Sequence, residues 1–153
     1  MKAISPLRCE VSFNGSLGLV QFVLADYTGN RMLDCVFCQI IEGKLPAIFV
    51  FKSADVVAFK PKSSAAPVQV LIVPTKHIKS LAGVIETDKD VLGRIQIAAS
   101  KLAKKLGIKK AFRLLAASGA SAGQSVFHLH YHLIGGWEGK SPKMETEPGG
   151  LRR

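Results

Sequence analysis

The chain has 153 residues, 48% of them hydrophobic, which is enough for one domain with a buried core and too few for two ordinary domains. Its 21 lysines and arginines outnumber 11 acidic residues, and the formal charge of +10 favours anionic partners such as nucleotides, nucleic acid or anionic lipid. No apolar run reaches the about 20 residues of a membrane helix, and three cysteines, an odd number, argue against a disulfide framework. We therefore expect a soluble, intracellular and cytoplasmic protein, or an organellar one if residues 1–31 are a cleaved leader.

The sequence divides into an extension over residues 1–33, one folded domain over 34–136 and a tail over 137–153 that is rich in proline and glycine. Within the extension, residues 8–24 either form a β-hairpin that turns at Asn14-Gly15 or are a simple apolar extension. Met32 offers an alternative start just before the folded domain, so the role of the extension stays open.

The first half of the domain predicts one short helix and three strands. Asp34 is placed to cap a helix over residues 35–41, which stops near Gly43 and Pro46. Apolar, β-branched stretches separated by turn residues then predict antiparallel strands over 47–51, 56–59 and 68–73. We expect these strands to form a meander.

The second half predicts a long helix and two more strands. Apolar residues recur at helical spacing between a cap at Thr87 and Asp90 and a stop at Gly107, with lysines crowding the last turns. Strands are then expected over 112–116 and 125–134. The fold class is α+β, with an antiparallel sheet of about five strands.

Cys35 and Cys38 are spaced to lie on one helical turn, which is a common half-site for tetrahedral zinc. A redox pair or plain buried residues are the alternatives, and the redox role is disfavoured because no thioredoxin-like βαβ pattern surrounds the pair. Zinc needs two more ligands, and His77 and one of three later histidines are the candidates.

These three histidines, His128, His130 and His132, alternate with apolar residues. In an extended strand this spacing sends all three imidazoles to one face, about 6 to 7 Å apart. The alternative interpretation is an ordinary strand whose outward-facing residues are histidines without a role in a site. Glycine, glutamine and serine flank the run and allow close backbone approach or hydrogen bonds to a ligand, so we interpret the histidines as facing a site.

Residues 123–136, GQSVFHLHYHLIGG, resemble the signature of the histidine triad (HIT) superfamily, and most closely its Hint branch. The predicted element order over 34–136 is that of HIT proteins. The resemblance implies zinc on Cys35, Cys38, His77 and His128, in the manner of several HIT proteins. Four protein ligands leave no open position for water, so this zinc would be structural.

The resemblance also assigns chemical roles. His130 would attack the α-phosphorus of a nucleotide conjugate to give a nucleotidyl-histidine that water hydrolyses, and His132 would contact the phosphate oxygens. Ser125 would offer a hydroxyl near the leaving group, and the Gln124 amide would neutralise charge on the phosphoryl oxygens. The remaining nucleotide-binding residues implied are Gly123 and the apolar base pocket of Phe37, Leu45 and Phe59.

The sequence departs from the Hint pattern at two contacts to the nucleotide. Pro61 stands where Hint proteins keep an aspartate that binds the ribose hydroxyls, and Ala117 stands where they place an asparagine. Lys60 and Lys62 beside Pro61 offer anion attraction in exchange. We expect altered nucleotide specificity.

The leading hypothesis is therefore a Hint-like hydrolase or transferase of purine nucleotide conjugates, and the resemblance implies a homodimer. A non-catalytic module that binds a nucleotide or a partner protein is the alternative. A third hypothesis, motivated by the charge of +10, is an aprataxin-like enzyme acting on adenylated nucleic-acid ends.

Overall fold

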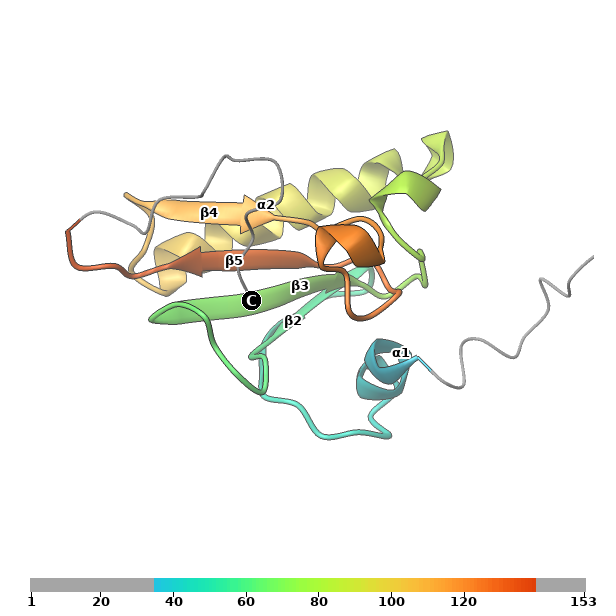
Figure 1. The fold of residues 1–153 in the computed structure, drawn as a ribbon, viewed down its shortest axis with the longest axis horizontal. Helices are drawn as coiled ribbons and strands as arrows, with labels where there is room; N and C mark the ends of the chain where they lie inside the picture. Colours follow the sequence, from blue (N-terminus) through green and yellow to red (C-terminus); the bar gives the residue numbers. More distant parts are fainter. Residues whose placement is uncertain (1–34, 140–153) are drawn as a thin grey trace, which may run out of the picture.

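The structure of the chain is a computed structural model that describes residues 35–139 (Figure 1). Its two α-helices are α1 (Val36–Ile41) and α2 (Lys89–Lys105). Its strands are β1 (Phe49–Lys52), β2 (Val56–Phe59), β3 (Val68–Pro74), β4 (Phe112–Leu115) and β5 (Tyr131–Gly135). The predicted cap at Asp34, the hairpin of the extension and most of the tail lie outside the described residues.

The five strands form one antiparallel sheet in the order β1-β2-β3-β5-β4. The first three strands are the predicted meander. The last strand, β5, inserts between β3 and β4, so that β3 and β4 run in the same direction and are joined through α2. A helical crossover is what two such strands need, because a tight hairpin connects only antiparallel neighbours.

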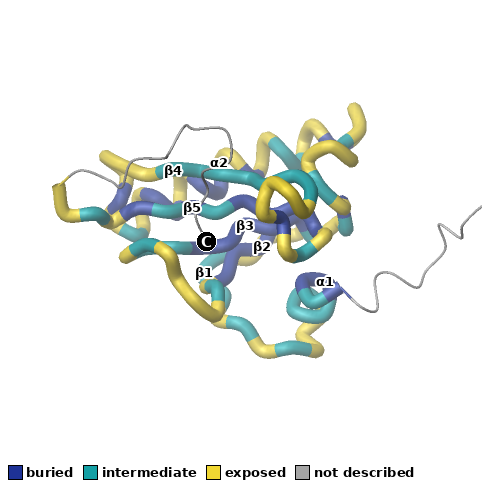
Figure 2. The backbone as a smooth tube through the Cα atoms, in the orientation of Figure 1, coloured by how far each residue is buried: buried dark blue, intermediate teal, exposed yellow. Residues whose placement is uncertain are grey.

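Alternate residues of each strand serve two different apolar layers. One face of the sheet meets α2, which buries Ile95, Ala98 and Leu102 against Ile72 and Leu133. Large aliphatic side chains of this kind each contribute about 1.5 to 3 kcal/mol when fully buried. This layer, behind the sheet in Figure 1, is the main core of the domain, and β2 and most of β3 are dark blue in Figure 2.

The opposite face carries α1 in a smaller layer. Phe37 and Cys38 of the helix pack with Val57, Phe59 and Leu71 of β2 and β3. The helix has only six residues, and its N-cap, Cys35, makes no side-chain cap hydrogen bond. Because isolated helices this short are marginal in water, its position depends on the side chains that it buries.

Some predicted element boundaries are wrong, and the strand expected over 47–51 is observed at Phe49–Lys52. The strand expected over 125–134 begins only at Tyr131, because residues 126–128 bend and the backbone N–H of Leu129 bonds to Ile78 beyond the end of β3 (2.6 Å). The helix cap expected at Thr87 and Asp90 is also wrong. Thr87 lies in a 3-10 turn, Glu86–Asp88, and α2 follows it.

Asp88 instead organises the start of α2. Its buried carboxylate accepts the backbone N–H of Ile85 at 3.1 Å and pairs with the Lys76 ammonium at 2.6 Å. These bonds, that of the lysine first, hold the pKa of Asp88 below its ordinary value.

Among residues 35–139, no helix is both long and apolar enough to cross a membrane.

Candidate active site and metal centre

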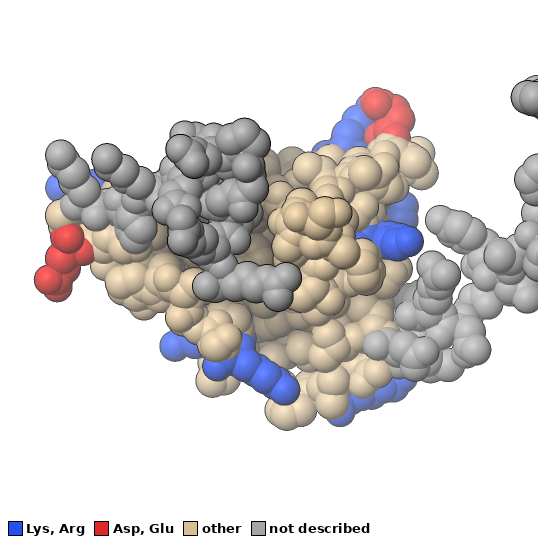
Figure 3. Space-filling view, viewed as in Figure 1, with Lys and Arg blue, Asp and Glu red and all other residues tan. Residues whose placement is uncertain are grey.

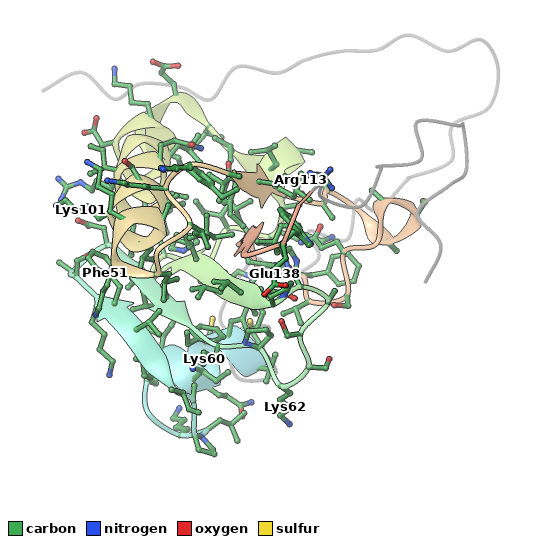
Figure 4. The ribbon with its side chains drawn as sticks, turned by 90° about the vertical axis from the view of Figure 1, so that its left-hand side faces the viewer. Phe51, Lys60, Lys62, Lys101, Arg113 and Glu138 are labelled. Atoms are coloured by element: carbon green, nitrogen blue, oxygen red, sulfur yellow. The ribbon has the colours of Figure 1, made fainter. Side chains whose placement is uncertain are left out.

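Four side chains that are far apart in the sequence converge between α1 and the sheet. Cys35 and Cys38 come from α1 and its N-cap, His77 follows β3, and His128 precedes β5. Their ligand atoms all lie within 4.8 Å of one another. Figure 4 shows the sulfur atoms in yellow next to α1. The structure therefore brings together all four residues that the sequence proposed as metal ligands.

The distances within this cluster fit a tetrahedral ion. The Sγ atom of Cys38 lies 3.2 Å from Nδ1 of His77 and 3.5 Å from Nδ1 of His128, and Cys35 Sγ is also 3.5 Å from the latter. Zinc bonds of about 2.3 Å to sulfur and 2.0 Å to nitrogen place tetrahedral ligands about 3.5 Å apart. The four residues can hold a metal ion.

The backbone fixes which nitrogen of His128 faces the thiols. Its Nε2–H donates to the carbonyl oxygen of Pro74 at 2.9 Å, and since a carbonyl can only accept, the hydrogen must be on Nε2. The Nδ1 lone pair is then free toward the cysteines in the neutral ring. A second hydrogen bond of this kind orients histidine ligands in many metal sites.

Burial favours the uncharged forms of Cys38, His77 and His128 when no ion is present. It lowers the pKa of His128 to about 4 and lowers that of His77, and it raises the pKa of Cys38 to about 12. The neighbouring Cys35 thiol raises the Cys38 value further. A cation that binds here displaces the Cys38 proton and gains two neutral imidazoles without competition from protons at pH 7.

His130 lies beside the metal cluster and is 4% exposed. Its Nδ1–H donates to the carbonyl oxygen of His128 at 2.7 Å. The hydrogen is therefore on Nδ1, and Nε2 carries the lone pair of the neutral ring. The Phe37 ring stands edge-on to the imidazole with the centroids 5.1 Å apart, which restricts how the imidazole can turn. An oriented imidazole with a free Nε2 is equipped to act as a nucleophile.

His132 lies at the second position of β5, and its ring centroid is 5.1 Å from that of His130. The three triad histidines thus lie on one side of the sheet, the side that carries α1, although only His132 is in β5. The intervening Leu129, Tyr131 and Leu133 belong to the core against α2. Burial, followed by the charge of His130, lowers the pKa of His132.

Gln69 of β3 is a neighbour of His132 that the sequence analysis missed. Its side-chain Nε2 lies 3.1 Å from His132 Nδ1. A signal was available, because Gln69 is the one polar side chain in the β3 sequence VQVLIVP. Its parity with Leu71 and Val73 assigns it to the α1 face. The Pro74 carbonyl was also missed, and no side-chain pattern could reveal it.

The predicted base pocket is only partly assembled around the histidines. Phe37 and Phe59 are buried and meet edge to face with centroids 5.5 Å apart. Both belong to the α1 layer, so they also serve as ordinary core. Leu45 is half-buried in the turn after α1, and its backbone N–H bonds to Gln39.

The loop before the triad holds Gly123, Gln124 and Ser125. Gly123 has φ of +89°, a conformation that favours glycine, and it ends a short 3-10 turn. Gln124 is 2% exposed, and its amide accepts from Gly119 and donates to the carbonyl oxygens of Lys79 and Val126. Its donors are directed at the backbone, so it braces this loop. Ser125 is exposed.

The flanking glycines after the triad have a packing reason. A Cβ atom on Gly135 would lie 3.0 Å from the backbone oxygen of Ala111 and from the Ile108 side chain. A Cβ on Gly136, where φ is +82°, would lie 2.9 Å from Val68. The sequence suggested that these glycines admit a ligand. In the structure they admit neighbouring protein atoms.

The basic residues do not form one surface on the face shown in Figure 3, where lysine and arginine side chains are separated by uncharged surface. Lys60 and Lys62 are exposed in the connection between β2 and β3 and are labelled in Figure 4. Pro61 between them is half-buried, and so is Ala117 after β4. Neither side chain can hydrogen-bond a ribose hydroxyl.

Comparisons with known proteins agree with this architecture. The model of the HIT domain family matches residues 42–139. An uncharacterized HIT-like protein of Synechocystis is 40% identical over 103 residues, which cover 67% of this chain and 90% of that protein.

Two solved structures extend the likeness to three dimensions. A HIT family hydrolase from Clostridium thermocellum is 44% identical with a TM-score of 0.69, and the match covers 72% of this chain and 96% of that one. A histidine triad nucleotide-binding protein from Candida albicans is 27% identical with a TM-score of 0.60, covering 72% and 87%. The fold, the triad and the family match lead to one conclusion: the chain belongs to the HIT domain family.

Proposed function

We propose that this protein is a Hint-like hydrolase or transferase of nucleotide conjugates, acting on phosphoramidates or nucleotidyl esters. The observation that carries the proposal is the 2.7 Å hydrogen bond from His130 Nδ1–H to the His128 carbonyl, which leaves Nε2 of His130 as the free lone pair. Two relatives support the reaction class, since one is named a hydrolase and the other a nucleotide-binding protein.

The proposed reaction has two steps at phosphorus. Nε2 of His130 attacks the α-phosphorus, forming a nitrogen–phosphorus bond while the bond to the leaving amine or oxygen breaks and the leaving group takes up a proton. Water then attacks the phosphorus, the bond to His130 breaks, and a nucleoside monophosphate leaves. His132 donates to the phosphoryl oxygens, and Ser125 lies near the leaving group.

Zinc is the metal that this site fits best. Cys35, Cys38, His77 and His128 would hold it as a closed structural site, which would tie α1 to the segment before β5. The ion supplies no step of the reaction in this proposal. Instead, it would hold His128, whose carbonyl orients His130, and α1, whose Phe37 borders the same imidazole.

The base is proposed to lie against Phe37, Leu45 and Phe59, with Gly123 allowing the loop to approach the phosphates. Because Pro61 and Ala117 offer no side-chain hydrogen bond, the ribose makes fewer contacts than in Hint proteins. Each neutral hydrogen bond that is missing costs about 0.5 to 1.5 kcal/mol. We therefore expect weak discrimination between ribonucleotides and 2′-deoxyribonucleotides.

The remaining expectations follow from the family. We propose that residues 34–136 form the catalytic unit, that the protein is a homodimer, and that the partner is a nucleotide conjugate more than a nucleic acid. On the face drawn in Figure 3 the described lysines and arginines are separated by uncharged surface, so this face lacks the continuous basic surface that suits a nucleic acid. Sedimentation equilibrium tests the dimer.

The first test is hydrolysis of a fluorogenic adenosine phosphoramidate by the wild type and by His130→Ala at matched zinc content. We expect turnover by the wild type and a loss of at least about a thousand-fold in the variant, because the nucleophile is gone. Rapid quenching with substrate labelled at the α-phosphorus should trap a nucleotidyl adduct on the wild type alone.

Ile97→Ala is the matched control, since Ile97 is 58% exposed on α2, across the sheet from the triad. It should keep full activity. If the wild type binds adenosine nucleotides without turnover, the protein is a binding module. If it turns over only adenylated DNA or RNA ends, with steep salt dependence, the aprataxin-like alternative replaces the present proposal.

A further inference from the structure

The Gln69 side chain makes hydrogen bonds at both ends, and its orientation is therefore determined. Its Oε1 accepts the backbone N–H of Ala65 at 2.7 Å, with the Ser64 hydroxyl 3.4 Å away. A backbone N–H can only donate, so this end of the amide must be the oxygen. The nitrogen is then the end that faces His132 Nδ1, at 3.1 Å.

This orientation dictates the protonation of His132. An amide NH₂ group only donates, so Nδ1 of His132 must accept and bear the lone pair. The hydrogen of the neutral ring is then on Nε2. The adjacent His130 has the opposite arrangement, since its Nδ1–H donates to the His128 carbonyl. The two rings have centroids 5.1 Å apart. At their Nε2 atoms, His130 therefore presents a lone pair and His132 presents an N–H donor.

The sheet register supplies the geometry. Gln69 pairs with Ile134, and Leu71 pairs with His132, so Gln69 and His132 are diagonal neighbours on one face of β3 and β5. Diagonal positions lie about 7 to 8 Å apart, a span that a long amide side chain can bridge. Both backbones belong to regular strands near the middle of the sheet, which favours a fixed orientation over a mobile one.

We propose that Gln69 is a positioning residue, which holds His132 as an Nε2–H donor toward a phosphoryl oxygen and couples it to the 64–66 turn between β2 and β3. The role of His132 in catalysis rests on the proposed function, whereas its tautomer does not. The connection between β2 and β3 also carries the exposed Lys62. The Gln69 side chain therefore links this connection to His132 of the triad.

Two substitutions separate the two ends of the amide. Gln69→Glu keeps an oxygen for the Ala65 N–H but removes the donor to His132. A carboxylate only accepts, so His132 must then carry a hydrogen on Nδ1. Gln69→Leu removes both bonds at similar size. Ser64→Ala is the matched control, because it removes the outer contact to Oε1, together with the hydroxyl bond to the Ala66 carbonyl oxygen (2.6 Å), and leaves the bond to His132 in place.

The experiment is long-range proton–nitrogen NMR of zinc-loaded protein labelled with ¹⁵N-histidine, with His132 assigned from His132→Ala. We expect an unprotonated Nδ1 and a protonated Nε2 in the wild type and in Ser64→Ala, a protonated Nδ1 in Gln69→Glu, and a mixture of tautomers in Gln69→Leu. A wild-type His132 with its hydrogen on Nδ1, or one tautomer unchanged by both Gln69 variants, overturns the proposal.

Phosphoramidate turnover by the same variants tests whether Gln69 affects catalysis through His132. We expect kcat to fall about ten-fold or more in Gln69→Glu with little change in KM, because the lost donor acts on charge that develops in the transition state. An altered tautomer with unchanged kcat overturns the positioning role. A wild type that shows no turnover overturns the proposed function, and the tautomer of His132 is then still decided by NMR alone.

Discussion

Phe37 is the residue through which α1 contacts the chemistry. Its ring stands edge-on to His130 at 5.1 Å, to His128 at 6.0 Å and to Phe59 at 5.5 Å between centroids. One side chain thus touches the proposed nucleophile, a proposed metal ligand and the wall of the proposed base pocket. Its burial, at 6% exposed, makes it both a core residue and a residue of the site.

We predict that Phe37→Leu lowers the free energy of unfolding by about 1 to 2 kcal/mol and lowers kcat by several-fold. The variant keeps an apolar side chain but loses the aromatic edge contacts and leaves a small cavity. Urea unfolding and phosphoramidate turnover measure the two effects.

Phe49→Leu is the control for Phe37→Leu, because Phe49 also meets Phe59 edge to face, at 5.8 Å. No aromatic contact joins it to a histidine within residues 35–139. It should lower stability and leave kcat as it is. Equal loss of kcat in both variants would show that general loosening of the α1 layer, and not the contact with His130, is responsible.

At the scale of elements, α1 and the segment before β5 depend on each other. The helix contributes two thiols and Phe37, and the segment contributes His128 and His130. Neither element is hydrogen-bonded to a neighbouring strand as part of the sheet ladder. The helix has six residues, and the sheet ladder of β5 begins only after His130. A metal ion that bridges them would replace the missing backbone pairing.

We predict that removing the metal with a chelator frees α1 while α2 stays intact. Amides that bond within the first helix, such as Gln39 to Cys35 and Glu42 to Cys38, should exchange with deuterium more than ten-fold faster after chelation. Amides of Lys89–Lys105 should keep their protection, since that helix is held by the main core.

Cys38→Ala serves as the control for the chelation experiment, because it lacks one ligand before any chelator is added. Its α1 amides should exchange fast under both conditions, and the chelator should have no further effect. Protection of α1 that is the same in the wild type with and without metal would contradict the role given to the ion. It would also assign the stability of the helix to Phe37 and Cys38 burial alone.

The sequence predicted the elements well where one local pattern decides them. The strand over 56–59 is confirmed to the residue, and the helical stripe of Ile95, Ala98 and Leu102 is confirmed as the buried face of α2. The strand over 125–134 was wrong at its start. Apolar and polar residues continue to alternate through His128 and His130. However, the His128 side chain contacts Cys35 beside α1, and the backbone of residues 128–130 does not pair in the sheet.

In the site, too, residues marked by a sequence pattern could be predicted, whereas contacts formed only on folding could not. The identities of the four clustered ligands could be predicted, because ligand types and family resemblance both point to them. Gln69, the Pro74 carbonyl and the bracing role of Gln124 could not be predicted so readily. Each depends on a hydrogen bond between segments that only the folded chain brings together.

At the scale of the whole molecule, the sheet separates two functions. Its α2 face is an aliphatic core that provides stability, and its α1 face collects all four histidines, two thiols and an aromatic cluster. Burying several imidazoles on one face has an energetic consequence. Burial lowers the pKa of His77, His128 and His132, so the fold favours their neutral forms.

That preference predicts how the stability of the metal-free protein depends on pH. The pKa of His128 is about 4 in the fold and about 6.5 in an unfolded chain. Between these values the unfolded chain binds a proton that the folded protein does not, so the free energy of unfolding falls as the pH falls. This group alone should remove about 2 kcal/mol between pH 7.5 and 5. The pKa values of His77 and His132 shift in the same direction, whereas the lowered pKa of Asp88 affects stability mainly below about pH 5. Urea unfolding of the chelated protein from pH 7.5 to 5 measures the slope, with Ile97→Ala expected to follow the wild type and His128→Asn to lose the part of the dependence that His128 contributes. A slope of zero in the wild type would mean that the metal-free fold lets the imidazoles reach water, and the α1 layer would then form only around the ion.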